Sequence, residues 1–156
     1  MLRLSKKTDY GLLALQYLAA EAPSGVASAR AIAERHDIPV EILAKVLQRL
    51  ARRGLVAAQK GAHGGYHLAR PAASISLAEV VQAFDGPLAM TACGRRDDRC
   101  VQFDNCTIRD PLSRVTERIL SVLQAMTLAE MVDEDGTFPV VLSKSEAGRS
   151  VPVDAR

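Results

Sequence analysis

The feature that most constrains the fold is a basic amphipathic segment, residues 40–53, followed at once by a glycine-rich hairpin pattern, residues 54–70. In residues 40–53, basic side chains recur at i, i+4 and i+7, on a different face from the apolar ones. The basic positions are Lys45, Arg49 and Arg52, and the apolar ones are Ile42, Leu43, Val46, Leu47 and Leu50. This pattern predicts a helix with a buried face and a basic face, narrow enough to enter a DNA major groove.

The hairpin pattern begins after Gly54, which is placed to end the helix. Short strands are expected over residues 55–60 and 66–70, around a turn at 61–65 that holds three glycines. A hairpin directly after a recognition helix is the wing of a winged helix, and Lys60 and His63 at its tip are expected to contact phosphate or a groove. The glycine turn is not a nucleotide-binding loop, because it lacks the Gly-Lys-Ser/Thr ending and opens no helix.

Two helices are expected before the basic one, which completes a helix-turn-helix. Ser5 is a plausible N-cap for the first, which should stop near 23–25. The second should run from about Ser28 to Asp37, and Pro39 marks the break before the third. The expected fold is therefore mainly α with a small β-hairpin wing, and residues 1–72 form the winged helix-turn-helix head. The residues expected to contact DNA are Ser28, Glu41, Lys45, Gln48, Arg49, Arg52, Lys60 and His63.

The charge distribution supports a polyanion as partner of the front half. Residues 1–70 carry 11 lysines and arginines against 5 acidic residues, whereas residues 71–156 carry 9 against 13. Charge of this kind also occurs on an ordinary solvated surface, so the helix and wing patterns carry more of the argument. The front of the chain holds no apolar run of signal-peptide length, and no later segment is long enough to span a bilayer, so a cytoplasmic protein is expected.

All three cysteines of the chain, Cys93, Cys100 and Cys106, lie within one short charged stretch. An odd number of cysteines without an export signal argues against a disulfide framework and favours metal binding or redox reactivity. A structural zinc site prefers four closed ligands, often in close C-x₂-C pairs, and this stretch has neither. Thiolates at wider spacing suit an iron–sulfur cluster, although a thiol switch or incidental cysteines remain alternatives.

Residues 73–132 are expected to connect the head to a dimer interface. Ser76 and Glu79 form a capping-box pattern for a short helix that ends at Gly86. Asp110 and Pro111 are placed as the cap and first turn of a long helix. Its apolar residues share one face, which predicts a dimer seam or a core face: Leu112, Val115, Ile119, Val122, Leu123 and Met126. Residues 133–156 are expected to form a loosely ordered tail.

Several of these segments, taken in order, resemble the iron–sulfur winged-helix regulators of the IscR and NsrR type. The resemblance rests on residues 1–10, 50–56 and 60–69 and on the three cysteines, and it covers about residues 1–132. The opening segment is most similar to regulators that accompany SUF cluster-assembly operons. The resemblance implies a homodimer that binds a palindromic operator in double-stranded DNA. It also implies one iron–sulfur cluster per subunit, of the 4Fe–4S or 2Fe–2S type.

The chain departs from this family at the fourth cluster ligand. IscR-like members place a histidine three residues after the last cysteine, where this chain has Arg109, which cannot bind iron. NsrR-like members use an aspartate of the first helix, donated by the partner subunit, and Asp9 matches that position. The resemblance therefore implies Cys93, Cys100 and Cys106 with Asp9 across the dimer. The simpler interpretation of Asp9 is a carboxylate that complements the dipole of the first helix.

The sequence thus predicts a DNA-binding transcription regulator that senses iron–sulfur status and controls cluster-assembly genes. A nitric-oxide- or redox-responsive repressor with the same cluster, and a metal-free thiol-switch regulator, are the alternatives. No nucleophile–base–acid set is evident in the sequence, so an enzyme is not expected.

Overall fold

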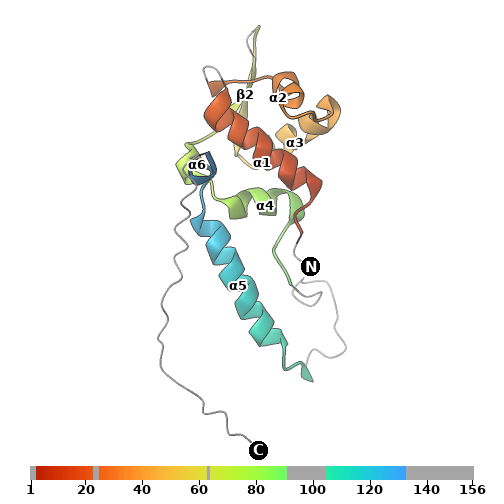
Figure 1. Ribbon diagram of the computed structural model, residues 1–156, viewed down its shortest axis with the longest axis vertical. Helices are drawn as coiled ribbons and strands as arrows, with labels where there is room; N and C mark the ends of the chain where they lie inside the picture. Colours follow the sequence, from red (N-terminus) through yellow and green to blue (C-terminus); the bar gives the residue numbers. More distant parts are fainter. Residues whose placement is uncertain (1–2, 23–24, 63, 91–104, 133–156) are drawn as a thin grey trace, which may run out of the picture.

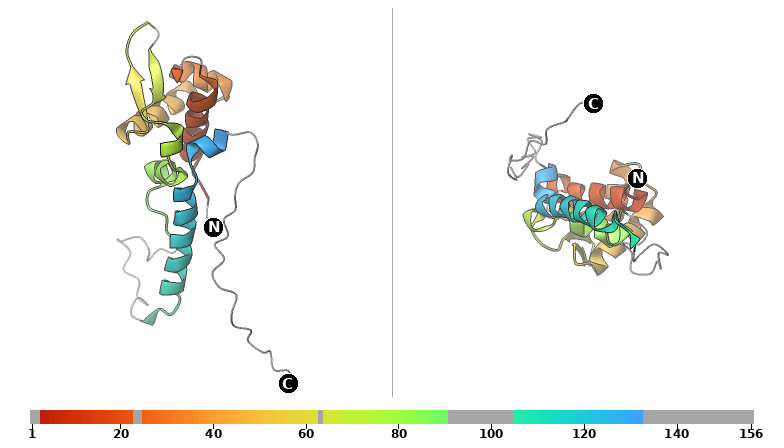
Figure 2. Two further views of the ribbon diagram at one scale, coloured as in Figure 1. Left: turned by 90° about the vertical axis from the view of Figure 1, so that its left-hand side faces the viewer. Right: turned by 90° about the horizontal axis from the view of Figure 1, so that it is seen from below.

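The computed structural model describes residues 3–22, 25–62, 64–90 and 105–132. Short helices and a two-stranded hairpin form a head at one end of the molecule, and the long helix α5 (Arg109–Ala125) extends away from it (Figure 1). Figure 2 shows the same arrangement from the side, with the hairpin projecting from the head at the end opposite α5. The predicted fold class, mainly helical with a β-hairpin wing, is confirmed.

The first helix begins at the predicted cap. In α1 (Lys6–Gln16) the Ser5 hydroxyl accepts a hydrogen bond from the Thr8 backbone N–H, which satisfies one of the free donors of the first turn. The helix continues into a π-helical segment, η1 (Tyr17–Glu21), which ends at Ala22, close to the predicted stop.

The helix-turn-helix consists of α2 (Ala29–Arg35) and α3 (Val40–Arg52). Asp37 adopts a left-handed conformation with φ of 51° between them, which reverses the chain over a short turn. At the end of α3, Gly54 has φ of 69°, and Leu55 N–H donates to Leu50 C=O over 3.0 Å. This is a Schellman cap, as the position of Gly54 predicts, and it directs the chain into the wing.

The wing is an antiparallel pair, β1 (Val56–Gln59) and β2 (Gly65–Leu68), with Val56 opposite Leu68 and Gln59 opposite Gly65. Ala27, just before α2, pairs with Tyr66 through two backbone hydrogen bonds of 2.9 and 2.8 Å. The sequence pattern did not reveal this third strand-like contact. Gly65 permits it, because a β-carbon there would collide with the Ala27 carbonyl oxygen.

After a short 3₁₀ turn, η3 (Ala72–Ser74), the predicted capping box opens α4 (Leu77–Asp85). The Ser76 hydroxyl accepts from the Glu79 N–H over 3.3 Å, and the Glu79 carboxylate accepts from the Ser76 N–H over 3.0 Å. Burial would raise the pKa of Glu79, but the Ser76 backbone hydrogen bond and the contact with Arg70 outweigh it and lower that pKa. The helix ends at Gly86, as predicted, with φ of 77°.

The long helix forms, but its beginning and its end differ from the prediction. Ile108 rather than Asp110 occupies the N-cap position of α5, and Asp110 lies inside the first turn. Met126 already lies beyond the helix, as its C-cap. A further helix, α6 (Leu128–Val132), was not predicted. It returns to the head, where Leu128 N–H donates to Ile75 C=O over 2.8 Å and the Leu128 side chain is buried.

One hydrophobic core contains side chains from both sides of residue 72. Leu15, Ile32, Leu47 and Leu50 pack in the same cluster as side chains from later in the chain, namely Ile75, Val80, Ala83, Phe84 and Leu128. No side chain of α5 is buried, so α4 and α6 complete the head while α5 does not. The division of the chain at residues 72 and 73 remains a prediction, and residues 133–156 lie outside the described part.

Candidate nucleic-acid interface and sensor site

The outer face of α3 brings together four of the residues predicted to contact DNA. Glu41, Lys45, Gln48 and Arg52 recur every three or four residues, and all four are exposed. They lie opposite the buried side of the helix, which is formed by Leu43, Val46, Leu47 and Leu50. The core thus fixes the helix from behind and leaves a continuous polar face, with two cations, toward solvent.

Arg49 is also exposed, but its side chain is held against α4. Its Nε donates a hydrogen bond of 2.6 Å to the Ala83 carbonyl oxygen in α4, and its guanidinium lies 5.7 Å from the centre of the Phe84 ring. Around the helix axis Arg49 lies close to both Lys45 and Arg52, four residues after the first and three before the second. The sequence pattern assigned Arg49 to the basic face with Lys45 and Arg52, whereas its side chain is directed to α4.

Two aliphatic residues at the start of α3 are exposed, which the sequence pattern did not predict. Val40 is 40% exposed, and Ile42, which the pattern assigned to the buried stripe, is 43% exposed. They flank Glu41 at the N-terminal end of the helix. A signal existed in the spacing: the buried residues of α3 repeat as 43, 46, 47 and 50, and position 42 lies outside that repeat.

The remaining predicted DNA contacts are distributed around this helix. Lys60 is exposed directly after β1, and His63 lies outside the described residues. Ser28 is exposed, and its hydroxyl accepts a 3.1 Å hydrogen bond from the Ala31 N–H as the cap of α2. Its side chain therefore has a structural role at the start of the helix that packs against α3.

The sensor segment is described only in part. Cys106 is a free, half-buried thiol that lies three residues before α5, and Cys93 and Cys100 fall within residues 91–104, outside the described ranges. Within those ranges, no three histidine, cysteine or acidic side chains gather as metal ligands. Asp9 is exposed in the first turn of α1, and the Nε of Arg109 donates to the Asp110 carboxylate over 3.1 Å.

The last turn of α4, from which the chain leads to the cysteines, is bound to the start of α1. Asp85 Oδ2 accepts hydrogen bonds from the Ser5 N–H at 3.1 Å and from the Thr8 hydroxyl at 2.8 Å. Burial would raise the pKa of Asp85, but hydrogen bonds from Ser5 and Thr8 and the charge of Arg49 outweigh it and lower that pKa. Asp9, next to Thr8, therefore lies at the end of α1 that α4 contacts.

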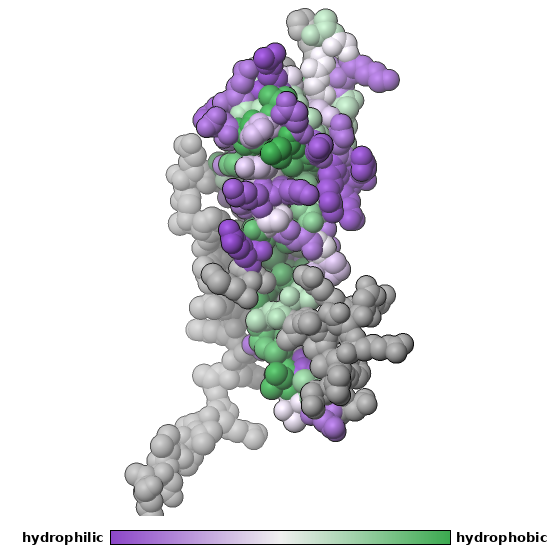
Figure 3. Space-filling view, turned by 90° about the vertical axis from the view of Figure 1, so that its right-hand side faces the viewer, coloured by the Kyte–Doolittle hydropathy of each residue, from purple (hydrophilic) through white to green (hydrophobic). Residues whose placement is uncertain are grey.

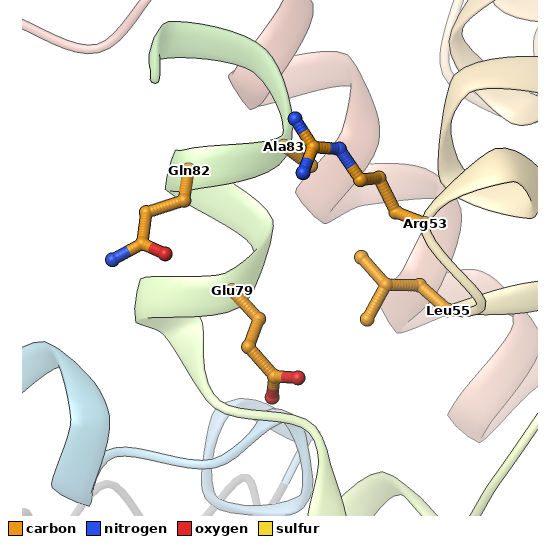
Figure 4. A pocket seen from close by; sticks show the side chains of 5 residues that line it. All are labelled: Arg53, Leu55, Glu79, Gln82 and Ala83. Atoms are coloured by element: carbon orange, nitrogen blue, oxygen red, sulfur yellow. The ribbon is translucent and has the colours of Figure 1, made fainter. Parts of the chain in front are cut away.

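Two hollows of the head are lined by side chains other than cysteine. A small pocket of about 140 Å³ lies between the end of α3 and α4, and Arg53 reaches across it toward Ala83 while Glu79 lies at its other side (Figure 4). A larger, open hollow of about 500 Å³ lies beside the wing, where its lining includes Gln59, His67 and Arg70. Arg70 already binds the Glu79 carboxylate and the Ser74 carbonyl oxygen.

A trihelical head with an exposed polar face on its third helix, followed by a hairpin wing, defines a winged-helix DNA-binding protein. The match to a family model agrees: residues 4–134 fit the Rrf2 family, described as iron-dependent transcriptional regulators. The chain belongs to the Rrf2 family, and it is a DNA-binding transcription regulator rather than an enzyme.

Solved structures of regulators share the fold. IscR of T. potens is 30% identical, with a TM-score of 0.64, over 84% of this chain and 86% of that one. CymR of B. subtilis, described as the global cysteine regulator, is 25% identical, with a TM-score of 0.68, over 85% and 97%. The oxidized form of CymR from Staphylococcus aureus is 25% identical, with a TM-score of 0.64, over the same shares.

Rrf2 regulators commonly dimerise, and the surface of α5 has the character of an uncovered interface. Val115 is 41% exposed and Val122 is 59% exposed, seven residues apart on one side of the helix. Figure 3 shows the contrast: hydrophilic residues cover much of the head on this face, and hydrophobic ones gather below it. In the described ranges, no helix is both long and apolar enough to cross a membrane.

Proposed function

We propose that this Rrf2 protein is a cytoplasmic sensor of iron–sulfur supply that controls genes of cluster assembly. Cys93, Cys100 and Cys106 bind one iron–sulfur cluster per subunit, and its presence sets the affinity of the dimer for its operator. The observation that carries this proposal is the position of α4. Its last turn contacts both α1 and α3 and leads directly into the segment that contains the cysteines.

The donor set fits an iron–sulfur cluster. Three thiolates at wide spacing are typical ligands of such clusters, and a fourth ligand of oxygen type leaves one iron open to exchange. The bound cluster supplies a group that oxygen, nitric oxide or iron shortage removes or alters. Asp9 is proposed as the fourth ligand, from the partner subunit. Its carboxylate is exposed at the end of α1 beside which α4 ends, so it is accessible to a second subunit.

The outer face of α3 is proposed to lie in the major groove. Lys45 and Gln48 offer donors to base edges, and Glu41 offers an acceptor for the cytosine amino group. Val40 and Ile42 add an apolar surface on either side of Glu41. Because the thymine methyl group is the apolar partner that the major groove presents, these side chains favour operators with thymines at the corresponding positions.

Dimerisation through α5 is proposed to place two such heads on one operator. A helix with an uncovered aliphatic stripe is stabilised when a second copy buries that stripe. The two α3 helices of a symmetric dimer must then match half-sites about 34 Å apart along B-DNA, so the operator is expected to be palindromic.

The experiment that tests this function is purification without oxygen, followed by visible spectroscopy and determination of iron and sulfide. Brown protein with stoichiometric iron and sulfide, in the wild type, is expected. Asp9→Ala should weaken or shift the absorption bands, whereas Glu34→Ala, a matched removal of an exposed carboxylate on α2, should not. Protein that stays colourless after reconstitution with iron and sulfide would contradict the proposal.

A metal-free thiol switch is the second candidate, and the likeness to the oxidized form of CymR favours it. In that case operator affinity would change with a thiol oxidant and recover with a reductant, in protein that binds no iron. Cys106→Ser would separate the two functions further. It should lower cluster content if the cysteines are ligands, and abolish the oxidant response if Cys106 is one of the two cysteines that form a disulfide.

A further inference from the structure

The Arg49 side chain joins the recognition helix to the last turn of α4. The Ala83 carbonyl that it binds is one of the last four carbonyls of that helix, which find no partner within the helix itself. The positive charge of Arg49 also complements the partial negative charge at that helix end. Its guanidinium lies over the ring of Phe84, the next residue of the same turn. One side chain of α3 therefore has two contacts with consecutive residues of α4.

The same turn of α4 is attached to α1 on its other side. Asp85 accepts the hydrogen bonds from Ser5 and Thr8, so a carboxylate complements the partial positive charge at the start of α1. Phe84 packs against α1 so closely that a β-carbon on Gly11 would come within 2.5 Å of the ring. Residues 83–85 thus contact both α1 and α3, and a displacement of this turn displaces the contacts of both helices.

The turn formed by residues 83–85 lies in the chain just before the segment that holds the cysteines. Directly after Asp85, Gly86 has a positive φ of 77°, and the chain continues to residues 91–104, which contain two of the three cysteines. Whatever changes the path of the chain after Gly86 acts first on the turn that Arg49 and Asp85 hold. Arg49 is the described side chain of α3 that hydrogen-bonds to this turn.

We propose that Arg49 is a positioning residue, through which cluster binding by residues 93–106, the segment with the three cysteines, sets the orientation of the recognition helix. The proposal rests on the sensing function proposed above and assigns its transmission to one side chain. It differs from the assignment of Arg49 as a phosphate contact, which its basic neighbours Lys45 and Arg52 suggest from sequence. The two roles have different consequences for DNA binding and can be separated by measurement.

Salt dependence distinguishes the two roles. Each phosphate that a cation neutralises contributes about −0.9 to the slope of log K against log salt concentration on B-DNA. Removing a phosphate contact therefore makes this slope less steep by about one unit, whereas removing a positioning residue leaves it unchanged. The second quantity is the coupling ratio, defined as the operator affinity of cluster-loaded protein divided by that of cluster-free protein.

The experiment compares Arg49→Met with Arg52→Met, a matched loss of an exposed arginine on the outer face of α3. The probe is a DNA fragment selected from a random library by the wild-type protein, and binding is followed by fluorescence anisotropy at several salt concentrations. Arg49→Met is expected to retain the wild-type slope and the wild-type iron and sulfide content, while its coupling ratio falls toward 1. Arg52→Met is expected to lose about 0.9 in slope and to retain the ratio.

Asp85→Asn, on the other side of the same turn, provides a second variant that touches no DNA in either role. It should lower the coupling ratio at an unchanged slope. A wild-type ratio in Arg49→Met overturns the inference, whatever the slope, because transmission would then not need the side chain. A ratio of 1 in the wild-type protein refutes the sensing function itself, and with it this inference.

Discussion

Gly11→Ala tests the contact between α1 and α4 on which the coupling depends. In an uncrowded helix, replacing glycine with alanine stabilises by about 1 kcal/mol, because alanine has the better helix propensity. Here the new β-carbon would lie 2.5 Å from Cε2 of Phe84 and 3.0 Å from Cζ. An ordinary contact of about 3.4 Å or more would require the ring to move by roughly 0.9 Å, and the ring is almost fully buried.

The expected sign comes from comparing the two effects. Overpacking a core in this way costs about 1–3 kcal/mol, which offsets or exceeds the gain in helix propensity. Gly11→Ala is therefore expected to change the free energy of unfolding by between about zero and 2 kcal/mol in the destabilising direction. Because Phe84 also lies under Arg49, the displaced ring should disturb the Arg49–Ala83 hydrogen bond as well.

The assay is urea unfolding at a fixed protein concentration, since dimerisation makes the apparent stability depend on concentration. The matched control is the same substitution in a Phe84→Leu background, where the smaller side chain leaves room for the β-carbon. There Gly11→Ala should become stabilising, by up to about 1 kcal/mol. The reasoning is refuted if Gly11→Ala stabilises the wild-type protein as much as it stabilises the Phe84→Leu variant.

Three further predictions concern burial, charge and exposure. Leu128→Ala should destabilise the head by about 2–5 kcal/mol in urea unfolding, because the side chain is 1% exposed within the main core; a loss below about 1 kcal/mol would contradict that position. The pKa of Asp85 lies below its ordinary value of 3.8. The ionised carboxylate therefore adds to the free energy of unfolding above about pH 3.8, and this contribution is lost as the pH falls through the lowered pKa. Thermal unfolding should therefore show Asp85→Asn less stable than wild type at pH 7, with a smaller difference at pH 3; a difference independent of pH would exclude this role. Val122→Glu should shift the protein from dimer to monomer in sedimentation velocity, whereas Gln124→Glu on the opposite side of α5 should not. A Val122→Glu variant that stays as dimeric as Gln124→Glu would show that Val122 is not in the dimer interface.

Local signals were sufficient to predict most of the fold. Ser5, Ser28 and Ser76 cap helices through hydrogen bonds to residues three positions later, so each signal is complete within four residues of sequence. Gly54 likewise ends α3 through its own backbone conformation. The prediction that Asp110 caps α5 was wrong. A proline fits at more than one position of the first helical turn, so Pro111 does not fix the N-cap, and Ile108 takes that position.

The features that were not predicted depend on contacts between distant residues. Arg49 and Ala83 are 34 residues apart, and no periodicity in α3 indicates that α4 supplies a free carbonyl beside it. The return of α6 to the head depends on Leu128 filling a space next to Ile75, and a five-residue helix has too little pattern to be recognised. The assignment of Cys93, Cys100 and His63 to their sites stays a prediction, since these residues lie outside the described ranges.

In the proposed function, the segment that holds the cysteines regulates a dimer on DNA from its place between α4 and α5. Before the segment, the last turn of α4 is bound to α1 and α3, and after it Cys106 lies close to the start of α5. If α5 pairs with a second copy, the segment connects the DNA-binding head to the dimer axis. Under the proposed function, a ligand bound by all three thiols would move each head relative to that axis, and by symmetry both α3 helices would move. Because the distance between the two α3 helices must match about 34 Å of B-DNA, a small movement would then alter operator affinity without any change in the residues that contact bases.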